Sequence, residues 1–261
     1  RVYANVNISR TKTGRFSYAN PNLQQVPKHS ELGRKLRFCF GGSGKVSVAD
    51  YSQVEMRVAA ALSGEPVLLD AFASGKDIHL EVAAEVLGKH PDHVTSEERF
   101  GAKAINFGIL NGMGARRLSH ELKSDQDTAQ RWLDNYQAGL PTLTNWMNKI
   151  WADAEIDRIV RTLSGRTRVY LAEEGVRSAI SVVVQGTAAD IMAASLVECE
   201  YAGLNPLLVV HDEIVAETTE INRLVEVMEA AANNLFPDQL GRVKFEADGY
   251  CANTWGGNEY E

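Results

Sequence analysis

The sequence predicts an α+β fold, in which strands and helices fall in separate blocks along the chain. Three observations indicate it. An alternating apolar stretch at 45–49 precedes a helix, residues 67–151 are helical nearly throughout, and two apolar runs at 207–210 and 214–217 flank a tight polar turn. A regular alternation of strands and helices, which would indicate a doubly wound parallel sheet, is not the pattern here.

The elements of the first half follow from composition and spacing. Residues 1–44 are rich in Asn, Gln, Pro, Gly and basic side chains, which predicts irregular chain with short strands. The strand at 45–49 stops at Asp50, and apolar residues at helical spacing then predict a helix through Leu62, which Gly64-Glu65-Pro66 ends. Thr95 with Glu98 three residues later has the spacing of a capping box, so another helix begins there.

In the second half, a turn at 162–166 is followed by a helical run from Gly175 to Tyr201. The two apolar runs then form a hairpin around His211-Asp212-Glu213. A helix from Ile221 to Leu235 and a strand around 243–247 complete the chain.

Length, charge and cysteine content bound the possible functions. The 261 residues suffice for one large domain or two that share a core, and the net charge of −7 argues against electrostatic coating of nucleic acid. Three dispersed cysteines favour a reducing intracellular setting. The apolar runs fall short of the ~18 residues that a membrane span needs, so no membrane is expected. Because the chain opens at Arg1, we expect it to be part of something longer.

Two carboxylates at strand ends are the strongest candidates for a functional site. Asp50 ends an apolar strand, and Asp212, 162 positions later, lies in the turn of the apolar hairpin. A carboxylate at the end of a buried strand needs a hydrogen bond, an ion pair or a bound cation. Asp50 as a helix cap and Asp212 as a turn former remain the alternative explanation, but the two together favour a metal site.

The contexts of these residues resemble a known family. Asp50-Tyr51-Ser52-Gln53-Val54-Glu55 and Val210-His211-Asp212-Glu213 are similar to motifs A and C of the family A DNA polymerases, the group of bacterial DNA polymerase I. Arg99, Lys103, Phe107 and Gly108 have the spacing of motif B. Further matches, in the family's order, are Thr13-Gly14-Arg15, Pro21-Asn22-Leu23-Gln24-Gln25, Asp77-Ile78-His79, Arg177 and Gln185-Gly186-Thr187-Ala188-Ala189-Asp190.

The resemblance implies a polymerase palm, an antiparallel sheet with helices, into which a mostly helical fingers subdomain is inserted. The expected boundaries are 1–63 for the first part of the palm, 64–172 for the fingers and 173–261 for the second part. From the resemblance we expect the thumb and exonuclease domains of the family to lie outside this chain, either in a removed remainder or in a second polypeptide.

The implied activity is template-directed addition of deoxynucleotides to a primer 3′ end, with primer-template DNA and dNTPs as partners. Two Mg²⁺ ions, or Mn²⁺ as a substitute, would be held by Asp50, Asp212 and the backbone carbonyl of Tyr51. Glu213 and Lys103 join the two aspartates as implied catalytic residues, although Glu213 can equally be a solvated hairpin residue.

The nucleotide is expected to contact one helical stripe, in which Arg99, Lys103 and Phe107 recur every four residues. Glu55 would block a 2′ hydroxyl, although it can instead close a capping box with Ser52. Asn111 stands where the family usually has Tyr, and an amide cannot supply the ring face, so we expect altered fidelity or lesion tolerance. The implied nucleotide-binding set is Gln53, Glu55, His79, Arg99, Lys103, Phe107 and Asn111.

Duplex contacts are implied for amides and basic side chains that suit the minor-groove acceptors shared by all correct base pairs. Ser181 and Val183, where the family usually has Asn and Pro, weaken this part of the match. Two other classes stay open: a catalytically weak or silent nucleic-acid-binding module, and a two-metal nuclease. The implied DNA-binding set is Arg15, Asn22, Gln24, Gln25, Arg177, Gln185 and His211.

Overall fold

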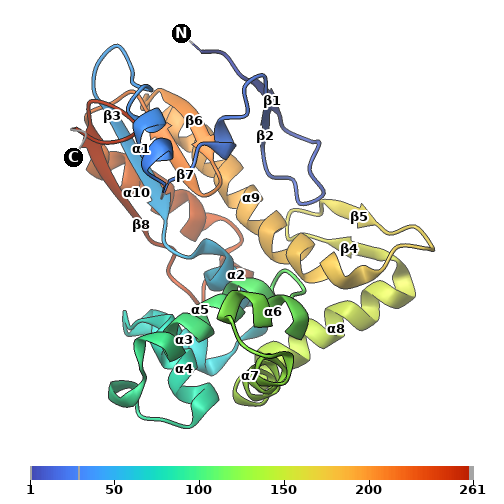
Figure 1. Ribbon diagram of the computed structural model, residues 1–261. Coiled ribbons are helices and arrows are strands. Elements are labelled where there is room, and N and C mark those ends of the chain that lie inside the picture. The colour runs from blue at the N-terminus through green and yellow to red at the C-terminus, as the bar shows by residue number, and fades with distance from the viewer. Residues whose placement is uncertain (1, 29, 259–261) are drawn as a thin grey trace. The chain divides into compact units, whose positions relative to one another are not determined.

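The computed structural model describes residues 2–28 and 30–258, which form an α+β protein with antiparallel sheets (Figure 1). The fold class predicted from the sequence is confirmed. Two compact units are present: Arg1–Val54 with Ala188–Pro237 and Phe245–Glu261, and Glu55–Thr187 with Asp238–Lys244. The palm and fingers boundaries at 63/64 and 172/173 remain predictions beside this division.

The first unit is built on a four-stranded antiparallel sheet (Figure 1). Because side chains alternate along a strand, Asp50 shares a sheet face with Val46 and Val48, whereas Tyr51 points to the other face. Asp50 lies opposite Glu213 on one side and Asp248 on the other. The strand order is β6 (Pro206–Val210), β7 (Glu213–Ala216), β3 (Val46–Tyr51) and β8 (Ala247–Ala252).

Different parts of the chain pack against the two faces of this sheet. On the face of Tyr51, its buried hydroxyl lies 2.7 Å from Ser195 of α9 (Ala179–Tyr201) and donates to the carbonyl of Met228 in α10 (Ile221–Asn234). The valines of the other face pack with Trp255 and Phe40. The predicted strand at 45–49, the helical run to Tyr201, the hairpin and the helix from Ile221 are thereby confirmed.

The segment before β3 contains more structure than the sequence predicted. A two-stranded sheet of β1 (Asn5–Asn7) and β2 (Ser17–Ala19) and a 3₁₀ turn η1 (Leu23–Gln25) agree with irregular chain and short strands. A helix, α1 (Glu31–Arg37), was not expected. Its N-cap is Ser30, whose hydroxyl accepts a hydrogen bond from Gly33 N at 3.1 Å.

The second unit is mostly helical. The carboxylate of Glu65, 1% exposed, accepts backbone hydrogen bonds from Val67, Thr142 and Leu143, and so caps the starts of α3 and α8 together. The helices are α2 (Val54–Ser63), α3 (Pro66–Ala73), α4 (Ile78–Leu87), α5 (Ser96–Ile109), α6 (Ala115–Leu122), α7 (Gln126–Gly139) and α8 (Pro141–Asp157), with a hairpin of β4 (Ile159–Arg161) and β5 (Thr167–Val169), and the short turns η2 (Pro91–His93), η3 (Val176–Ser178) and α11 (Pro237–Leu240).

One predicted strand is wrong. The last strand begins at Ala247 instead of 243, although Val243 and Phe245 are buried apolar residues. The backbone N–H and carbonyl of Phe245 both pair with the side chain of Asn233 at 2.9 Å, which takes the place of a neighbouring strand. The true strand was missed because its middle residues are exposed and include Asp248 and Gly249, both rare in strands.

The confirmed helical run to Tyr201 is more apolar than the short runs of apolar residues indicate. By length and hydropathy the stretch Val176–Tyr201 qualifies as a membrane span, but 67% of its most apolar window is buried inside the protein, as in the core helix of a globular domain.

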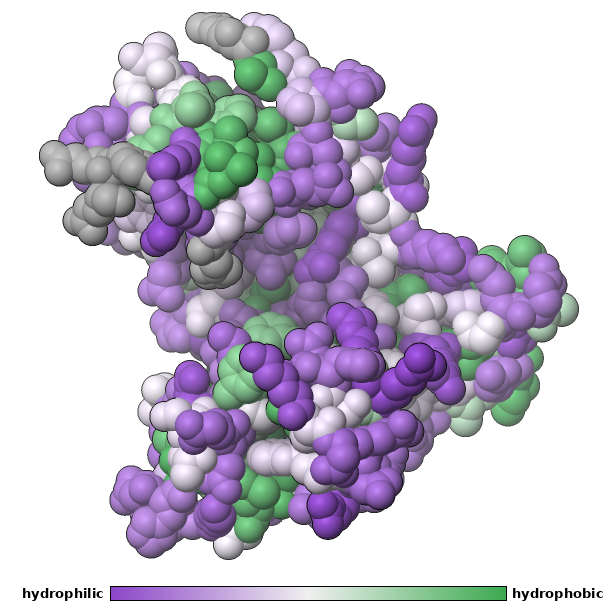
Figure 2. All heavy atoms as spheres, in the orientation of Figure 1, coloured by the Kyte–Doolittle hydropathy of each residue, from purple (hydrophilic) through white to green (hydrophobic). Residues whose placement is uncertain are grey.

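The first unit also carries a hollow of about 750 Å³, whose lining includes the hydrophobic residues Phe40, Leu207, Leu208 and Trp255. Hydrophobic side chains gather there in the region of α1 and β6 (Figure 2). None of the predicted site residues lines it, so the predicted chemistry lies elsewhere.

Candidate functional site

The sheet of the first unit brings the two sequence-distant aspartates together. A cavity of about 410 Å³ is lined by Asp50 at the end of β3, by Asp212 in the turn between β6 and β7, and by Glu213. The two segments are joined directly, because the backbone N–H of Tyr51 donates to the carbonyl of Asp212 at 3.0 Å. Antiparallel pairing of β3 with β7 therefore places both carboxylates at one cavity.

The turn that carries Asp212 is held in a costly conformation. His211 has φ 56°, in the left-handed region that non-glycine residues seldom occupy. Backbone of this kind persists where the surroundings enforce it, and it gathers at functional sites. Burial, together with the charge of Arg15, holds the pKa of His211 below its ordinary value, so this imidazole is neutral at pH 7.

Glu213 is held by buried partners. Its Oε1 accepts hydrogen bonds from Arg37 at 3.3 Å and from the indole N–H of Trp255 at 2.6 Å. The Arg37 guanidinium in turn lies 4.0 Å from the Trp255 ring centre, and both residues are buried. The alternative that Glu213 is a solvated hairpin residue is therefore wrong. No local spacing in the sequence links Arg37 or Trp255 to Glu213, so the sequence predicts neither contact.

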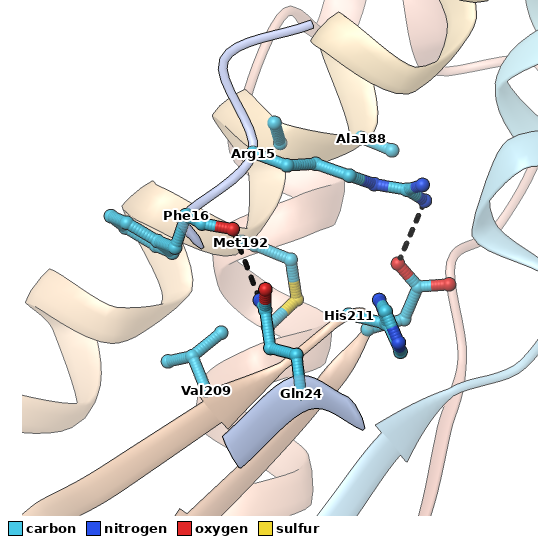
Figure 3. A pocket seen from close by; sticks show the side chains of 9 residues that line it. Arg15, Phe16, Gln24, Ala188, Met192, Val209 and His211 are labelled. Carbon is cyan, nitrogen blue, oxygen red and sulfur yellow. Dashed lines mark hydrogen bonds and ion pairs between the residues drawn. The ribbon is translucent and has the colours of Figure 1, made fainter. Parts of the chain in front are cut away.

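Two more basic side chains face the carboxylates. The Nζ of Lys28 lies 3.0 Å from Asp50 Oδ2 and 3.7 Å from Glu213 Oε2. Arg15 Nη2 lies 3.5 Å from Asp212 Oδ1, and the dashed line from Arg15 in Figure 3 marks this ion pair. Lys28 gave no signal in the sequence, being a single lysine in a polar segment.

The residues present fit a hard divalent cation. Among the residues that the structure describes, no three His, Cys, Asp or Glu side chains are close enough to hold a metal ion by themselves. Mg²⁺ retains several waters and takes only one or two carboxylates, so Asp50 and Asp212 suffice. That both already face basic groups shows that the strand ends attract positive charge.

The predicted duplex contacts of the first unit divide into two groups. Gln24 and Gln25 line the aspartate cavity, and the side chain of Gln24 donates to the carbonyl of Phe16 at 3.0 Å, as Figure 3 shows. Asn22 is exposed and caps η1 by accepting from Gln24 N. Gln53, which was predicted to bind the nucleotide instead, has φ 54° and a buried Oε1 that lacks a hydrogen-bond partner among the described residues.

In the second unit the predicted stripe lies on α5. Thr95 and Glu98 form the expected capping box, and Ala102, Ile105 and Ile109 face the core. The opposite side carries Arg99, Lys103 and Phe107, of which the last is 42% exposed.

The guanidinium of Arg99 forms an ion pair with Asp77. It lies 2.6 Å from Asp77 Oδ2, and Asp77 also caps α4 by accepting from the backbone N–H of His79. Partial burial raises the pKa of Asp77, but these hydrogen bonds outweigh it and hold the pKa below its ordinary value.

His79 is buried in a chain of polar side chains. Tyr136 donates to Asn106 Oδ1 at 2.9 Å, which orients the amide so that Asn106 Nδ2 donates to His79 Nδ1 at 3.0 Å. The proton of the neutral ring then sits on Nε2. Burial, with the nearby charges of Arg99 and Lys103, lowers the pKa of His79 to about 4.

Asn111 connects the end of α5 to α9. Its amide donates to the Phe107 carbonyl at 2.8 Å, and its Oδ1 accepts from Gln185 at 2.7 Å. Arg177 is exposed in η3, and Glu55 is half-buried in the first turn of α2.

Known proteins resemble the chain over nearly all of its length. The family model described as DNA polymerase family A matches residues 1–257. A thermostable DNA polymerase I of Thermus filiformis is 38% identical over 84% of this chain and 28% of its own length. DNA polymerase I of Pseudomonas aeruginosa is 37% identical over 84% of this chain and 26% of its own. The chain thus spans about a quarter of these relatives.

A solved structure agrees. The POL domain of Pol1 from M. smegmatis, in complex with DNA primer-template and dNTP, aligns with a TM-score of 0.86 and 30% identity, over 98% of this chain and 48% of that one. The chain belongs to DNA polymerase family A.

Proposed function

We propose that this chain is the core of a template-directed DNA polymerase, which adds deoxynucleotides to a primer 3′ end by two-metal-ion nucleotidyl transfer. The observation that carries the proposal is that Asp50 and Asp212, 162 positions apart in sequence, line one cavity at the ends of paired strands. Family membership supports the same activity.

Within this proposal, Asp50, Asp212 and the Tyr51 carbonyl hold the cations. Two bound divalent ions supply charge neutralisation at the phosphate and favour the ionised 3′ hydroxyl. The side chain of Tyr51 is already fixed by Ser195 and Met228, so its carbonyl is supported from the core. Glu213, fixed by Arg37 and Trp255, adds a rigid negative charge beside Asp50.

The nucleotide would lie along the exposed side of α5. Arg99 and Lys103 hold the triphosphate, and Phe107 presents its ring to the sugar or base. His79 is neutral, so its role at a phosphate is that of an Nε2–H donor. The half-buried Glu55 is the residue we assign to exclusion of a 2′ hydroxyl, with Gln53 and Asn111 completing the nucleotide side.

The duplex would be held by Arg15, Gln24, Gln25 and His211 in the first unit, with Asn22 nearby, and by Arg177 and Gln185 in the second. Amide donors of this kind contact minor-groove acceptors without reading sequence. The net charge of −7 is compatible with this, because part of the acidic excess serves the cation site. Further polypeptide, in the same chain or a second one, would supply the thumb, and an intracellular location is part of the proposal.

The test is primer extension on a labelled primer-template with Mg²⁺ and dNTPs. Asp212→Ala should lower the extension rate by about 10²- to 10³-fold or more, because it removes transition-state charge stabilisation. Asp153→Ala, on the exposed side of α8, is the matched control and should extend like the parent.

The outcomes separate three functions. Primer extension that depends on Asp212 supports a polymerase. Primer shortening would indicate a nuclease, and duplex binding without reaction would indicate the silent nucleic-acid-binding module. We expect extension to be distributive, because the chain spans about a quarter of its relatives.

A further inference from the structure

The acidic cavity contains a basic side chain, Lys28, that is about half exposed. Lys28 bridges two carboxylates, at 3.0 Å from Asp50 Oδ2 and 3.7 Å from Glu213 Oε2. It lines the cavity together with both acids. The register adds a third acid to the same row, since Asp50 lies between Glu213 and Asp248. Like charges directly opposite one another across strands destabilise a sheet, so this row needs a compensating cation.

The cations near this row differ in mobility. Arg37 has a side chain 8% exposed, lies against the Trp255 ring and is bound to Glu213, so it cannot leave without a large rearrangement. The side chain of Lys28 is 51% exposed and that of its partner Asp50 is 40% exposed. A solvated ammonium on a flexible four-carbon stem exchanges partners at low cost. Lys28 can therefore give way to another cation, and Arg37 cannot.

We infer that Lys28 is an exchangeable internal cation, which balances the carboxylates of the cavity when no divalent ion is bound and is displaced from Asp50 when one binds. The inference rests on the metal site of the proposed function. Its consequence is that Lys28 lowers the divalent-ion affinity of the site and thus sets the ion concentration at which the site fills.

A metal titration tests this without any activity measurement. Mn²⁺ binding to the full 261-residue chain is measured by electron paramagnetic resonance for the parent and for Lys28→Met. Removing the competing charge should tighten Mn²⁺ binding about three- to tenfold, the scale of one or two partly exposed ion pairs. Lys28→Arg, which keeps the charge, should remain close to the parent.

Lys35 provides a matched control. Its side chain is 49% exposed against 51% for Lys28, and it also pairs with a carboxylate, Glu31 Oε1 at 2.7 Å. That pair lies along α1, and neither residue lines the acidic cavity. Lys35→Met should leave Mn²⁺ affinity unchanged. If Lys28→Met binds Mn²⁺ no more tightly than Lys35→Met, the inference is wrong.

A second measurement follows the lysine itself. Acetylation of the parent by an N-hydroxysuccinimide ester, quantified residue by residue with mass spectrometry, should become faster at Lys28 when Mg²⁺ is added and stay constant at Lys35. An unchanged rate at Lys28 in protein that demonstrably binds metal refutes displacement. If Asp50→Asn binds Mn²⁺ as well as the parent, or the parent binds none, the metal site of the proposed function fails and the inference with it.

Discussion

The acidic cavity of the first unit and the basic stripe of the second are built in opposite ways. The cavity collects side chains from distant parts of the chain, and a buried network holds one of them, since Glu213, Arg37 and Trp255 are all nearly inaccessible to water. The stripe comes from one helix, and its Lys103 and Phe107 are exposed. Charge is thus positioned by buried contacts in one region and by helix periodicity in the other.

This difference indicates what each region tolerates. A buried ion pair is weak evidence for net stability, but removing one partner leaves an uncompensated charge in a poorly solvated place. An exposed pair loses little, because water solvates whichever charge remains. Substitutions around the cavity should therefore affect folding and function together, whereas those on the stripe should affect function alone.

The largest expected effect comes from matched arginine substitutions. Arg37→Met should lower the free energy of unfolding by about 3–5 kcal/mol, towards the lower value because Lys28 and Trp255 still contact Glu213. Arg99→Met, which breaks the exposed pair with Asp77, should cost about 1 kcal/mol or less. Urea denaturation of both variants gives the two numbers.

A second substitution at the same place separates charge from packing. Glu213→Gln in the Arg37→Met background removes the buried charge that Arg37 no longer neutralises, so it should recover part of the lost stability. Equal costs for Arg37→Met and Arg99→Met would remove the distinction between the two regions.

The sequence predicts which helices and strands exist better than it predicts where each one begins and ends. Capping-box spacing located α5, and apolar spacing located α2, α9 and the β6–β7 hairpin, because these patterns depend on neighbours a few residues away. The last strand was misplaced because Asn233 satisfies the backbone of Phe245, a contact between residues 12 apart that no periodicity reveals.

The same limit applies to the candidate site. Asp50 and Asp212 were found because each ends an apolar strand, and the α5 stripe was found from its four-residue spacing. Arg37, Trp255 and Lys28 act on the carboxylates from positions fixed only by the folded sheet. Sequence patterns thus identify residues that carry charge more readily than those that hold it in place.

His79 is buried, unlike the exposed Lys103 and Phe107 of the α5 stripe. Its protonation should therefore make the stability of the protein depend on pH. Its pKa is about 4 in the folded protein because of burial, against 6.5 for the ordinary side chain. As the pH falls, the unfolded chain therefore binds a proton at His79 before the folded protein does. The stability that comes from keeping this ring neutral is complete above pH 6.5 and is lost as the pH falls towards 4. The urea midpoint of the parent should fall more between pH 7.5 and pH 5 than that of His79→Gln.

His90, whose side chain is 67% exposed, serves as the control. His90→Gln should keep the pH dependence of the parent. If His79→Gln keeps it as well, the acid sensitivity arises elsewhere and the Tyr136–Asn106–His79 chain does not hold a neutral ring.

The smallest effect is expected at Asn111, where the stripe meets α9. Asn111→Tyr replaces an amide that binds Gln185 and the Phe107 carbonyl with an aromatic ring, at an exposed position. The free energy of unfolding should change by less than about 1.5 kcal/mol, because both hydrogen bonds are neutral and water can replace them at this exposed position. If the end of α5 contacts the nascent base pair, the misincorporation spectrum on a primed template should nevertheless change.

Gln185→Ala separates the causes, because it removes the hydrogen bond between Gln185 and Asn111 without adding a ring. An error spectrum shared by parent, Asn111→Tyr and Gln185→Ala would mean that this end of the stripe acts on neither the nucleotide nor the template.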